Sequence, residues 1–122
     1  MTFKLNKESR LRKRSLFRKV YEEGRFVANK MMAMHFIPNP DHSRRIGFSA
    51  GKKLGGAVVR NRCKRRLREC YRLHQNEMPA GVDLIIVARR ALVNAKWELI
   101  VGAFLDAFRR SRVMSERNRL SK

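Results

Sequence analysis

The residues best suited to chemistry lie in one short segment, VVRNRCKRRLRE at positions 58–69. Six of its twelve side chains are basic, and only Glu69 is acidic. Like charges at helical spacing repel one another, so such a segment is favoured only where a polyanion neutralises it. Five of the six cations are arginines, whose planar guanidinium groups bind phosphate through paired hydrogen bonds. The pattern therefore predicts a phosphate-binding surface, and nucleic acid is the commonest polyanion of this kind.

The composition of the whole chain favours the same partner. Its 122 residues include 30 Lys and Arg against 10 Asp and Glu, for a formal net charge of +20, and 43 % are hydrophobic. This apolar fraction predicts a folded protein rather than a disordered basic tail, and the length suits one domain. An anionic membrane is a weaker candidate for the partner. Because the sequence has no run of 18 apolar residues and no apolar signal-peptide core, we expect a cytoplasmic protein with no membrane partner.

The sequence contains no recognisable catalytic constellation. Its carboxylates are scattered, with only Glu22 and Glu23 adjacent, and adjacent residues on a helix do not face each other. The histidines have no motif around them, and the segment SAGKK lacks the spacing of a phosphate-cradling loop. Cys63 and Cys70 would lie about 10 Å apart on one helix, too far for a disulfide, and they have no zinc-ligand partner. We therefore expect no catalytic residue, no metal bound by the protein and no small-molecule substrate.

The basic segment is predicted to lie on an amphipathic helix. Its apolar residues recur at helical spacing and would face the core: they are Val59, Cys63, Leu67, Cys70, Tyr71 and His74. Basic residues occupy every fourth position on an adjacent face, as Arg60, Lys64, Arg68 and Arg72. Further cations widen this face, namely Arg62, Arg65 and Arg66.

Two features mark the start of this helix. Lys52 and Lys53 would extend the basic surface to the helix N-terminus, where free N–H groups and the helix dipole also favour phosphate. An ordinary charged turn is the alternative for this pair. Asn61 is an uncharged residue and a mediocre helix former. It either fixes an orientation through side-chain hydrogen bonds or is simply tolerated near a helix start.

Upstream of this helix, the sequence predicts one helix and two strands. The helix, over about residues 14–23, ends at Gly24. A first strand lies in residues 25–37, and a second, with alternating apolar residues, lies in residues 44–51. The Pro, Asn, Asp and Ser residues of 38–43 suit a turn between them, so the two strands are a hairpin candidate.

Downstream, the apolar run 82–88 predicts a strand buried on both faces. A last helix over residues 96–110 would present to the core Trp97, Val101, Phe104, Leu105 and Phe108. The basic tail 113–122 lacks this pattern and is predicted to be disordered. The predicted fold is an α+β sandwich of order α-β-β-α-β-α, in which one small sheet carries the helices of a single nucleic-acid-binding domain at 1–112.

The stretch RRIGFSAGKKLGGAVVRNRCKRRLRE at 44–69 resembles the signature of the bacterial ribonuclease P protein subunit. The resemblance extends over about residues 9–110. It implies that the RNA subunit, with Mg²⁺, is the catalyst that removes the 5′ leader from precursor tRNA, and that the protein is its accessory subunit. It also implies a left-handed β-α-β crossover through the basic helix.

The resemblance also implies two binding surfaces. The first contacts the catalytic RNA through Lys52, Lys53, Arg60, Asn61, Arg62, Lys64, Arg65 and Arg68. The second is a cleft between the first helix and the sheet, which holds the single-stranded precursor tRNA leader and includes Phe17 and Tyr21, with Lys53 at its border. His35 stands where relatives often have an aromatic residue, and an imidazole stacks more weakly.

Other classes of RNA-binding and DNA-binding protein are alternatives. A generic structured-RNA or ribosome-associated binding protein fits the composition equally well, and sequencing the RNA that copurifies would separate it from a tRNA-processing role. A DNA-binding helix-turn-helix protein is disfavoured, because KKLGG and a strand precede the basic helix where that motif needs a short helix. An autonomous nuclease is the least favoured reading.

Overall fold

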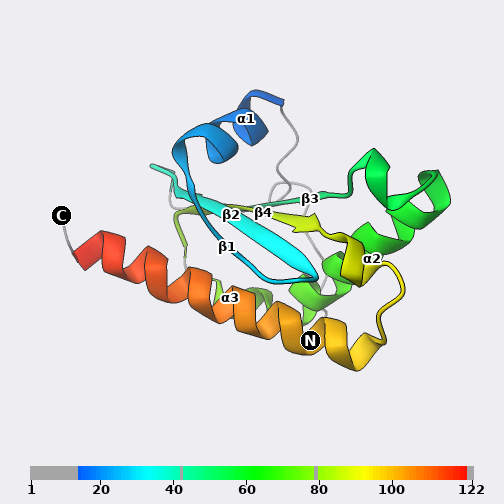
Figure 1. Ribbon diagram of the computed structural model, residues 1–122. Helices are drawn as coiled ribbons and strands as arrows, with labels where there is room; N and C mark the ends of the chain where they lie inside the picture. Colours follow the sequence, from blue (N-terminus) through cyan, green and yellow to red (C-terminus); the bar gives the residue numbers. More distant parts are fainter. Residues whose placement is uncertain (1–13, 42, 79, 121–122) are drawn as a thin grey trace.

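The computed structural model describes residues 14–41, 43–78 and 80–120, and for residues 115–120 it describes only the backbone. Three helices pack on one four-stranded sheet (Figure 1), which confirms the predicted α+β class. The elements follow in the order α1 (Arg14–Glu23), β1 (Arg25–Ala28), β2 (Met32–Pro38), β3 (Arg44–Ser49), α2 (Ala57–His74), β4 (Val82–Ala88) and α3 (Trp97–Leu120).

The segment predicted as a first strand forms two strands instead of one. Asn29 breaks it, because its Oδ1 accepts hydrogen bonds from the backbone N–H groups of Met31 and Met32, at 3.0 and 3.1 Å. Asn side chains commonly close turns in this way. β1 and β2 therefore pair as an antiparallel hairpin, with Phe26 opposite His35 and Val27 opposite Met34.

The predicted hairpin between β2 and β3 is wrong. The sheet order is β1-β2-β4-β3, so β4 lies between them, antiparallel to β2 and parallel to β3. The turn that was expected to join a hairpin instead bonds to the residue before β4: Asn39 N–H donates to Gly81 O, and Gly81 N–H donates to Ser43 O. β4 takes the central place because its residues, apart from Asp83, are apolar on both faces, as predicted, and its side chains are almost all buried.

β3, α2 and β4 form the crossover unit that the resemblance implies, because two parallel neighbouring strands are joined through the basic helix. The left-handed sense of this crossover stays a prediction.

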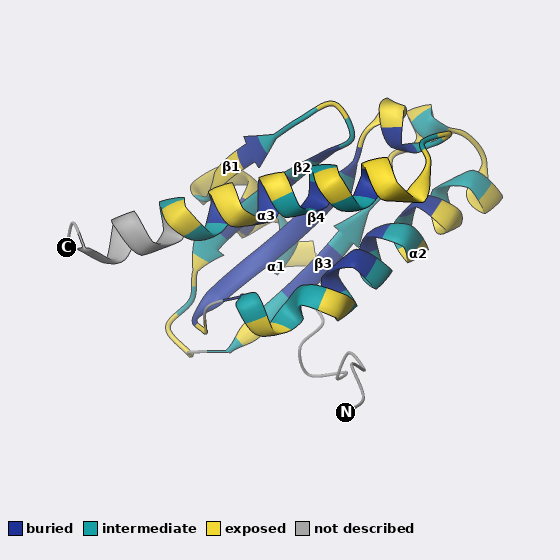
Figure 2. Ribbon diagram, turned by 90° about the horizontal axis from the view of Figure 1, so that it is seen from below, coloured by how far each residue is buried: buried dark blue, intermediate teal, exposed yellow. Residues whose placement is uncertain are grey.

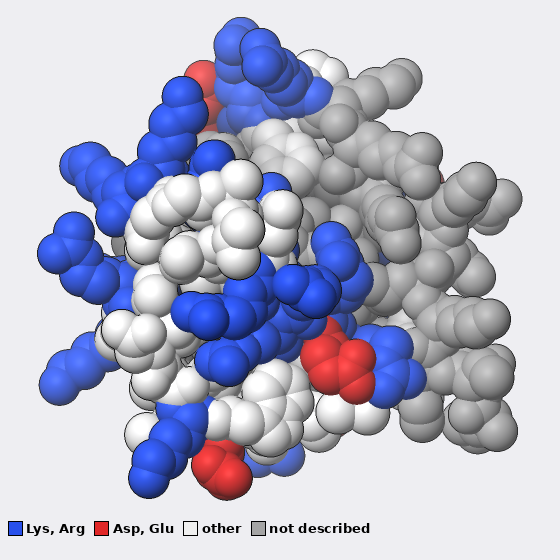
Figure 3. Space-filling model, turned by 90° about the vertical axis from the view of Figure 1, so that its right-hand side faces the viewer, with Lys and Arg blue, Asp and Glu red and all other residues white. Residues whose placement is uncertain are grey.

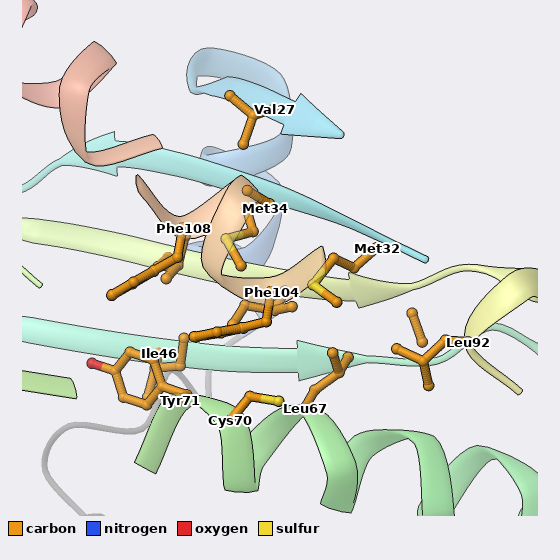
Figure 4. Close-up of a cluster of buried hydrophobic side chains, with 14 of the residues drawn as sticks. Val27, Met32, Met34, Ile46, Leu67, Cys70, Tyr71, Leu92, Phe104 and Phe108 are labelled. Atoms are coloured by element: carbon orange, nitrogen blue, oxygen red, sulfur yellow. The ribbon is translucent and has the colours of Figure 1, made fainter. Parts of the chain in front are cut away.

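The helices lie on both faces of the sheet. α1 covers part of one face, and α2 and α3 cover the other (Figure 1). The main core lies between the sheet and these two helices, where buried residues line the strands (Figure 2) and point toward one another (Figure 4). A smaller cluster under α1 centres on Val20 and Ile85. Cys63 and Cys70 are free and buried, as predicted.

α3 differs from the predicted last helix at both ends. Trp97 is its first residue and is exposed, because the first buried side chain of the helix is Ile100, one turn later. The helix also continues to Leu120, through much of the tail predicted to be disordered. Within that tail, Met114 packs against the main core. The apolar face of α3 therefore extends beyond residue 110, where the predicted helix ended. In the part of the chain described here, none of the helices is long and apolar enough to cross a membrane.

Candidate nucleic-acid interface

α2 is oriented by its apolar face, as the sequence predicts. Cys63, Leu67, Cys70 and Tyr71 are buried against the sheet and α3. Basic side chains therefore fall on the two flanks of the helix and on its outer surface. Figure 3 shows that Lys and Arg cover far more of this side of the molecule than Asp and Glu do.

The flank nearest β3 carries Arg60, Lys64 and Arg68. The Arg68 guanidinium lies 5.4 Å from the centre of the Phe48 ring on β3, a cation–π contact that fixes its position. The Nε of Arg60 is buried and has no hydrogen-bond partner among the described residues. The other N–H groups of Arg60, the guanidinium of Arg68 and the ammonium of Lys64 give this flank donors that suit phosphate oxygens.

The opposite flank of α2 meets the connection between β4 and α3. Arg62 donates to the carbonyl oxygen of Val93 at 3.3 Å, and Arg66 donates to that of Ala95 at 3.1 Å. These two arginines therefore help to position the connection as well as adding positive charge. Asn61 and Arg65 are exposed on the outer surface of the helix.

Lys52 and Lys53 lie beside the start of α2. They belong to a short 3₁₀ helix, Lys52–Leu54, and Gly55 and Gly56 join it to α2. Gly55 has φ 142°, a conformation that residues with a Cβ rarely adopt, and an added Cβ would lie 3.1 Å from that of Val59. The first turn of α2 contains no acidic residue, so nothing there opposes the positive end of the helix dipole.

The single acidic residue of α2 is neutralised within the helix. Arg72 donates from Nε to Glu69 Oε2 at 2.9 Å. This hydrogen bond lowers the pKa of the Glu69 carboxyl below its usual value, so the pair forms a closed unit at neutral pH.

The eight residues predicted to contact the catalytic RNA all lie on α2 or on the 3₁₀ helix just before it. We call them the basic surface: Lys52, Lys53, Arg60, Asn61, Arg62, Lys64, Arg65 and Arg68.

A second surface lies on the other face of the sheet, where four rings form a row. Phe17 and Tyr21 on α1 have ring centres 6.4 Å apart, Tyr21 and His35 4.9 Å, and His35 and Phe26 5.4 Å. The first three were predicted to contact the leader, and Phe26 extends the row onto β1. We call Phe17, Tyr21, His35 and Phe26 the aromatic row.

The members of the aromatic row differ in how far their rings are available. Phe17 is half-buried and packs with the small cluster of Val20 and Ile85, so it is partly a core residue. Tyr21 is 41 % exposed, and burial of the rest raises the pKa of its phenol while a hydrogen bond with Ser49 opposes the shift. Phe26 is 60 % exposed, the most exposed ring of the row.

His35 lies between two aromatic rings. Its burial lowers the pKa of the imidazole below 6.5, so the ring is mostly neutral at pH 7. The plane of the imidazole is tilted 28° from that of Phe26, a stacked arrangement. The neutral imidazole therefore packs between the rings of Tyr21 and Phe26 and joins them into one row.

Sequence reasoning missed Phe26, although a signal was present. Val27 is buried in the main core, and neighbouring strand residues point to opposite faces. Phe26 must then face the side of α1. The prediction of a single strand over residues 25–37 hid this alternation, because the turn at Asn29 interrupts the pattern of buried and exposed residues.

Residues that could bind a metal ion do not form a cluster in the part of the chain that the structure describes. Among the residues that the structure describes, no group of three or more His, Cys, Asp or Glu side chains lies close enough together to hold a metal ion. The basic surface consists of cations and one amide, and the aromatic row consists of four rings.

A protein-family model matches most of the chain. The family model of ribonuclease P matches residues 5–112. The ribonuclease P protein component of Alkaliphilus oremlandii is 37 % identical over 107 residues, which cover 88 % of this chain and 94 % of that protein. That of Symbiobacterium thermophilum is 43 % identical over 91 residues, covering 74 % and 79 %.

Solved structures show the same similarity. The RNase P protein of Staphylococcus aureus superimposes with a TM-score of 0.79 at 30 % identity, over 86 % of this chain and 96 % of that one. The RNase P protein of Thermotoga maritima gives a TM-score of 0.75 at 28 % identity, over 83 % and 96 %. Because each superposition extends over most of the chain, the similarity is one of the whole domain rather than of a single motif.

Proposed function

The chain belongs to the ribonuclease P protein family, and on that premise we propose that it binds the catalytic RNA of ribonuclease P and the 5′ leader of precursor tRNA at the same time. The basic surface on α2 takes the catalytic RNA, and the aromatic row takes the single-stranded leader. Support comes from the placement of the two surfaces, since α1 and α2 lie on opposite faces of the sheet (Figure 1). Two ligands bound there would not exclude each other.

The basic surface suits a folded RNA. Phosphate contacts from Arg and Lys supply most of the affinity for nucleic acid, through charge and counterion release. Arg68 is already held by Phe48, and Arg62 by Val93. Holding these side chains in advance reduces the conformational entropy that binding removes. A structured RNA that presents phosphates along the helix would meet cations in fixed positions.

The aromatic row suits an unpaired strand. Bases stack on aromatic side chains with little sequence preference, because every base has a π-face. Leaders differ in sequence between precursors, so a surface that binds bases by stacking alone can bind any of them. The observation that carries the leader assignment is Phe26, a ring that is 60 % exposed and stacked on His35.

Within this proposal the RNA subunit, with Mg²⁺, hydrolyses the precursor to leave a mature 5′ end. The protein positions the leader relative to the catalytic RNA and adds binding energy to the complex with precursor. We place this assembly in the cytoplasm. The side chains of the protein take no part in the bond cleavage itself.

Reconstitution tests this function directly. The chain would be added to the catalytic RNA of its own organism at an Mg²⁺ concentration too low for the RNA alone, and 5′ processing of a precursor tRNA would be followed. We expect processing to be restored. A variant with Arg60, Lys64 and Arg68 replaced by Ala should restore it only at higher protein concentration. No stimulation by the unchanged, folded chain would contradict the proposal.

The charge of +20 also suits a generic structured-RNA or ribosome-associated binding protein. Sequencing the RNA that copurifies with the chain separates the two functions. One abundant structured RNA together with precursor tRNAs supports ribonuclease P, and ribosomal RNA supports the alternative.

A further inference from the structure

Trp97 lies on the surface of the molecule, although its place in the sequence pattern predicts a core residue. It is the first residue of α3 and is 38 % exposed. It is also the only tryptophan in the chain. A tryptophan ring at the surface is available for stacking and for contact with a partner.

The ring lines a hollow beside the basic surface. This hollow, which we call the Trp97 hollow, has a volume of about 480 Å³ and is lined by Arg62, Arg65, Arg66, Glu69 and Trp97. Pockets for small ligands span about 300–1,000 Å³, so there is room for one planar group with its substituents. Arg62 and Arg65 belong to the basic surface, so the hollow continues that surface from α2 toward α3.

Hydrogen bonds hold the hollow in shape. Arg62 donates to Val93 O and Arg66 donates to Ala95 O, and both carbonyls belong to the connection between β4 and α3, which ends at Lys96 just before Trp97. Backbone bonds from Leu99 and Ile100 N–H to Lys96 O, at 3.0 and 3.1 Å, then begin α3. The backbone that carries Trp97 is thus held by hydrogen bonds to α2 on its N-terminal side and by the first turn of α3 on its C-terminal side.

The charge of the hollow favours an anion. Three guanidinium groups and one carboxylate line it, and that carboxylate, Glu69, is paired with Arg72. Arg65 is exposed on the outer surface of α2, so it is placed to bind a phosphate. An aromatic face beside cations matches a nucleotide, which carries a flat base and a phosphate. A base inside a duplex is already stacked on both faces, so the matching nucleotide is an unpaired one.

We propose that the Trp97 hollow binds one unpaired nucleotide of the catalytic RNA, with its base stacked on the indole and its phosphate bound by Arg65. The inference rests on the proposed function, because it takes the catalytic RNA as the ligand of the neighbouring basic surface. This nucleotide would add a stacking contact to an interface that otherwise depends on charged side chains. It also extends the RNA-contacting surface from α2 to the start of α3.

Fluorescence of the native chain provides the first test. Because Trp97 is the only tryptophan, its emission reports on this hollow alone. The full chain would be titrated with the catalytic RNA of its own organism, and binding would be measured in parallel by filter retention. We expect stacking to quench the emission in step with binding. Emission that stays unchanged while the RNA binds would overturn the inference and leave the proposed function standing. A chain that does not bind the RNA at all would overturn the proposed function itself.

Substitutions provide the second test, in variants whose circular dichroism matches that of the unchanged chain. Trp97→Leu keeps an apolar side chain but removes the π-face, and should weaken binding of the catalytic RNA by about 5- to 140-fold, the equivalent of about 1–3 kcal/mol. Trp97→Phe should restore most of the affinity. Leu99→Ala is the matched control, because Leu99 is 58 % exposed in the same turn of α3 and does not line the hollow. Unchanged affinity for Trp97→Leu, or an equal reduction for Leu99→Ala, would overturn the inference.

Discussion

The ring of Phe17 on α1 lies directly against Gly47 on β3. A Cβ built on Gly47 would be 2.5 Å from Cζ of Phe17, closer than real side chains come. The absence of a side chain at Gly47 thus lets α1 approach the sheet. Since α1 carries two members of the aromatic row, this contact links the packing of the helix to the placement of the proposed leader surface.

Gly47→Ala should destabilise the protein by about 1–3 kcal/mol, because the added methyl group displaces the Phe17 ring. Urea unfolding would measure this cost. In a Phe17→Ala background the clash is gone, and the same substitution should be neutral or stabilising by up to about 1 kcal/mol, since alanine restricts the unfolded chain more than glycine does. If the changes in unfolding free energy of the two substitutions simply add, the Phe17 ring and Gly47 are not in contact as described.

Replacing Arg60, Lys64 and Arg68 together by Ala should flatten the salt dependence of binding to the catalytic RNA. The slope of log affinity against log salt changes by roughly 0.7–0.9 for each phosphate that the protein no longer binds. The fold should persist, because these side chains lie outside the apolar face of α2, and removing the cation–π interaction of Arg68 with Phe48 should cost only about 0.5–1 kcal/mol. An unchanged slope in the folded triple variant would remove this flank from the interface.

His35 should titrate below pH 6.5, because burial disfavours its charged form. A base whose pKa is lower in the folded state than in the unfolded state stabilises the fold fully above pH 6.5. That contribution disappears as the pH falls from 6.5 through the folded pKa. NMR titration of the ring would give the midpoint. Phe26→Ala uncovers the imidazole and should move its pKa back up toward 6.5, and a midpoint at or above 6.5 in the unchanged chain would contradict this account.

Cys63→Ser should cost about 1–3 kcal/mol of stability, because it places a hydroxyl in the main core. Processing activity at saturating protein should stay the same. Burial raises the pKa of the Cys63 thiol, and it raises that of Cys70 to about 12, so neither forms much thiolate at neutral pH. Thiol reagents should therefore label the native chain slowly and the unfolded chain fast. Rapid labelling of native Cys63 would place it at the surface.

Much of the fold was predictable because it depends on local periodicity. Every apolar residue of α2 that the pattern assigned to the core is buried or half-buried, and α1 has the bounds that the pattern and Gly24 predicted. The basic surface followed, since a helix with one apolar face must direct its cations elsewhere.

Features that depend on contacts distant in sequence were not predictable. The placement of β4 between β2 and β3 is decided by its burial on both faces of the sheet, which no pattern within residues 38–43 reveals. Trp97 matched the helical period but precedes the first turn that meets the core. Phe26 was hidden by the turn at Asn29, where a side chain takes over backbone hydrogen bonds and restarts the alternation.

Substrate choice by a Phe26→Ala variant tests the central claim most directly. A precursor tRNA differs from its product by the leader, so a protein that stacks leader bases must favour the precursor. Phe26 is exposed, and its removal should disturb the fold less than removal of Phe17. In the reconstituted complex, affinity for the precursor should fall by about 1–3 kcal/mol, while affinity for mature tRNA and for the catalytic RNA stays nearly unchanged. Tyr21→Ala should act similarly and His35→Ala less, and Val113→Ala on α3 serves as an exposed apolar control. Equal reductions for precursor and mature tRNA would contradict the assignment of the aromatic row to the leader.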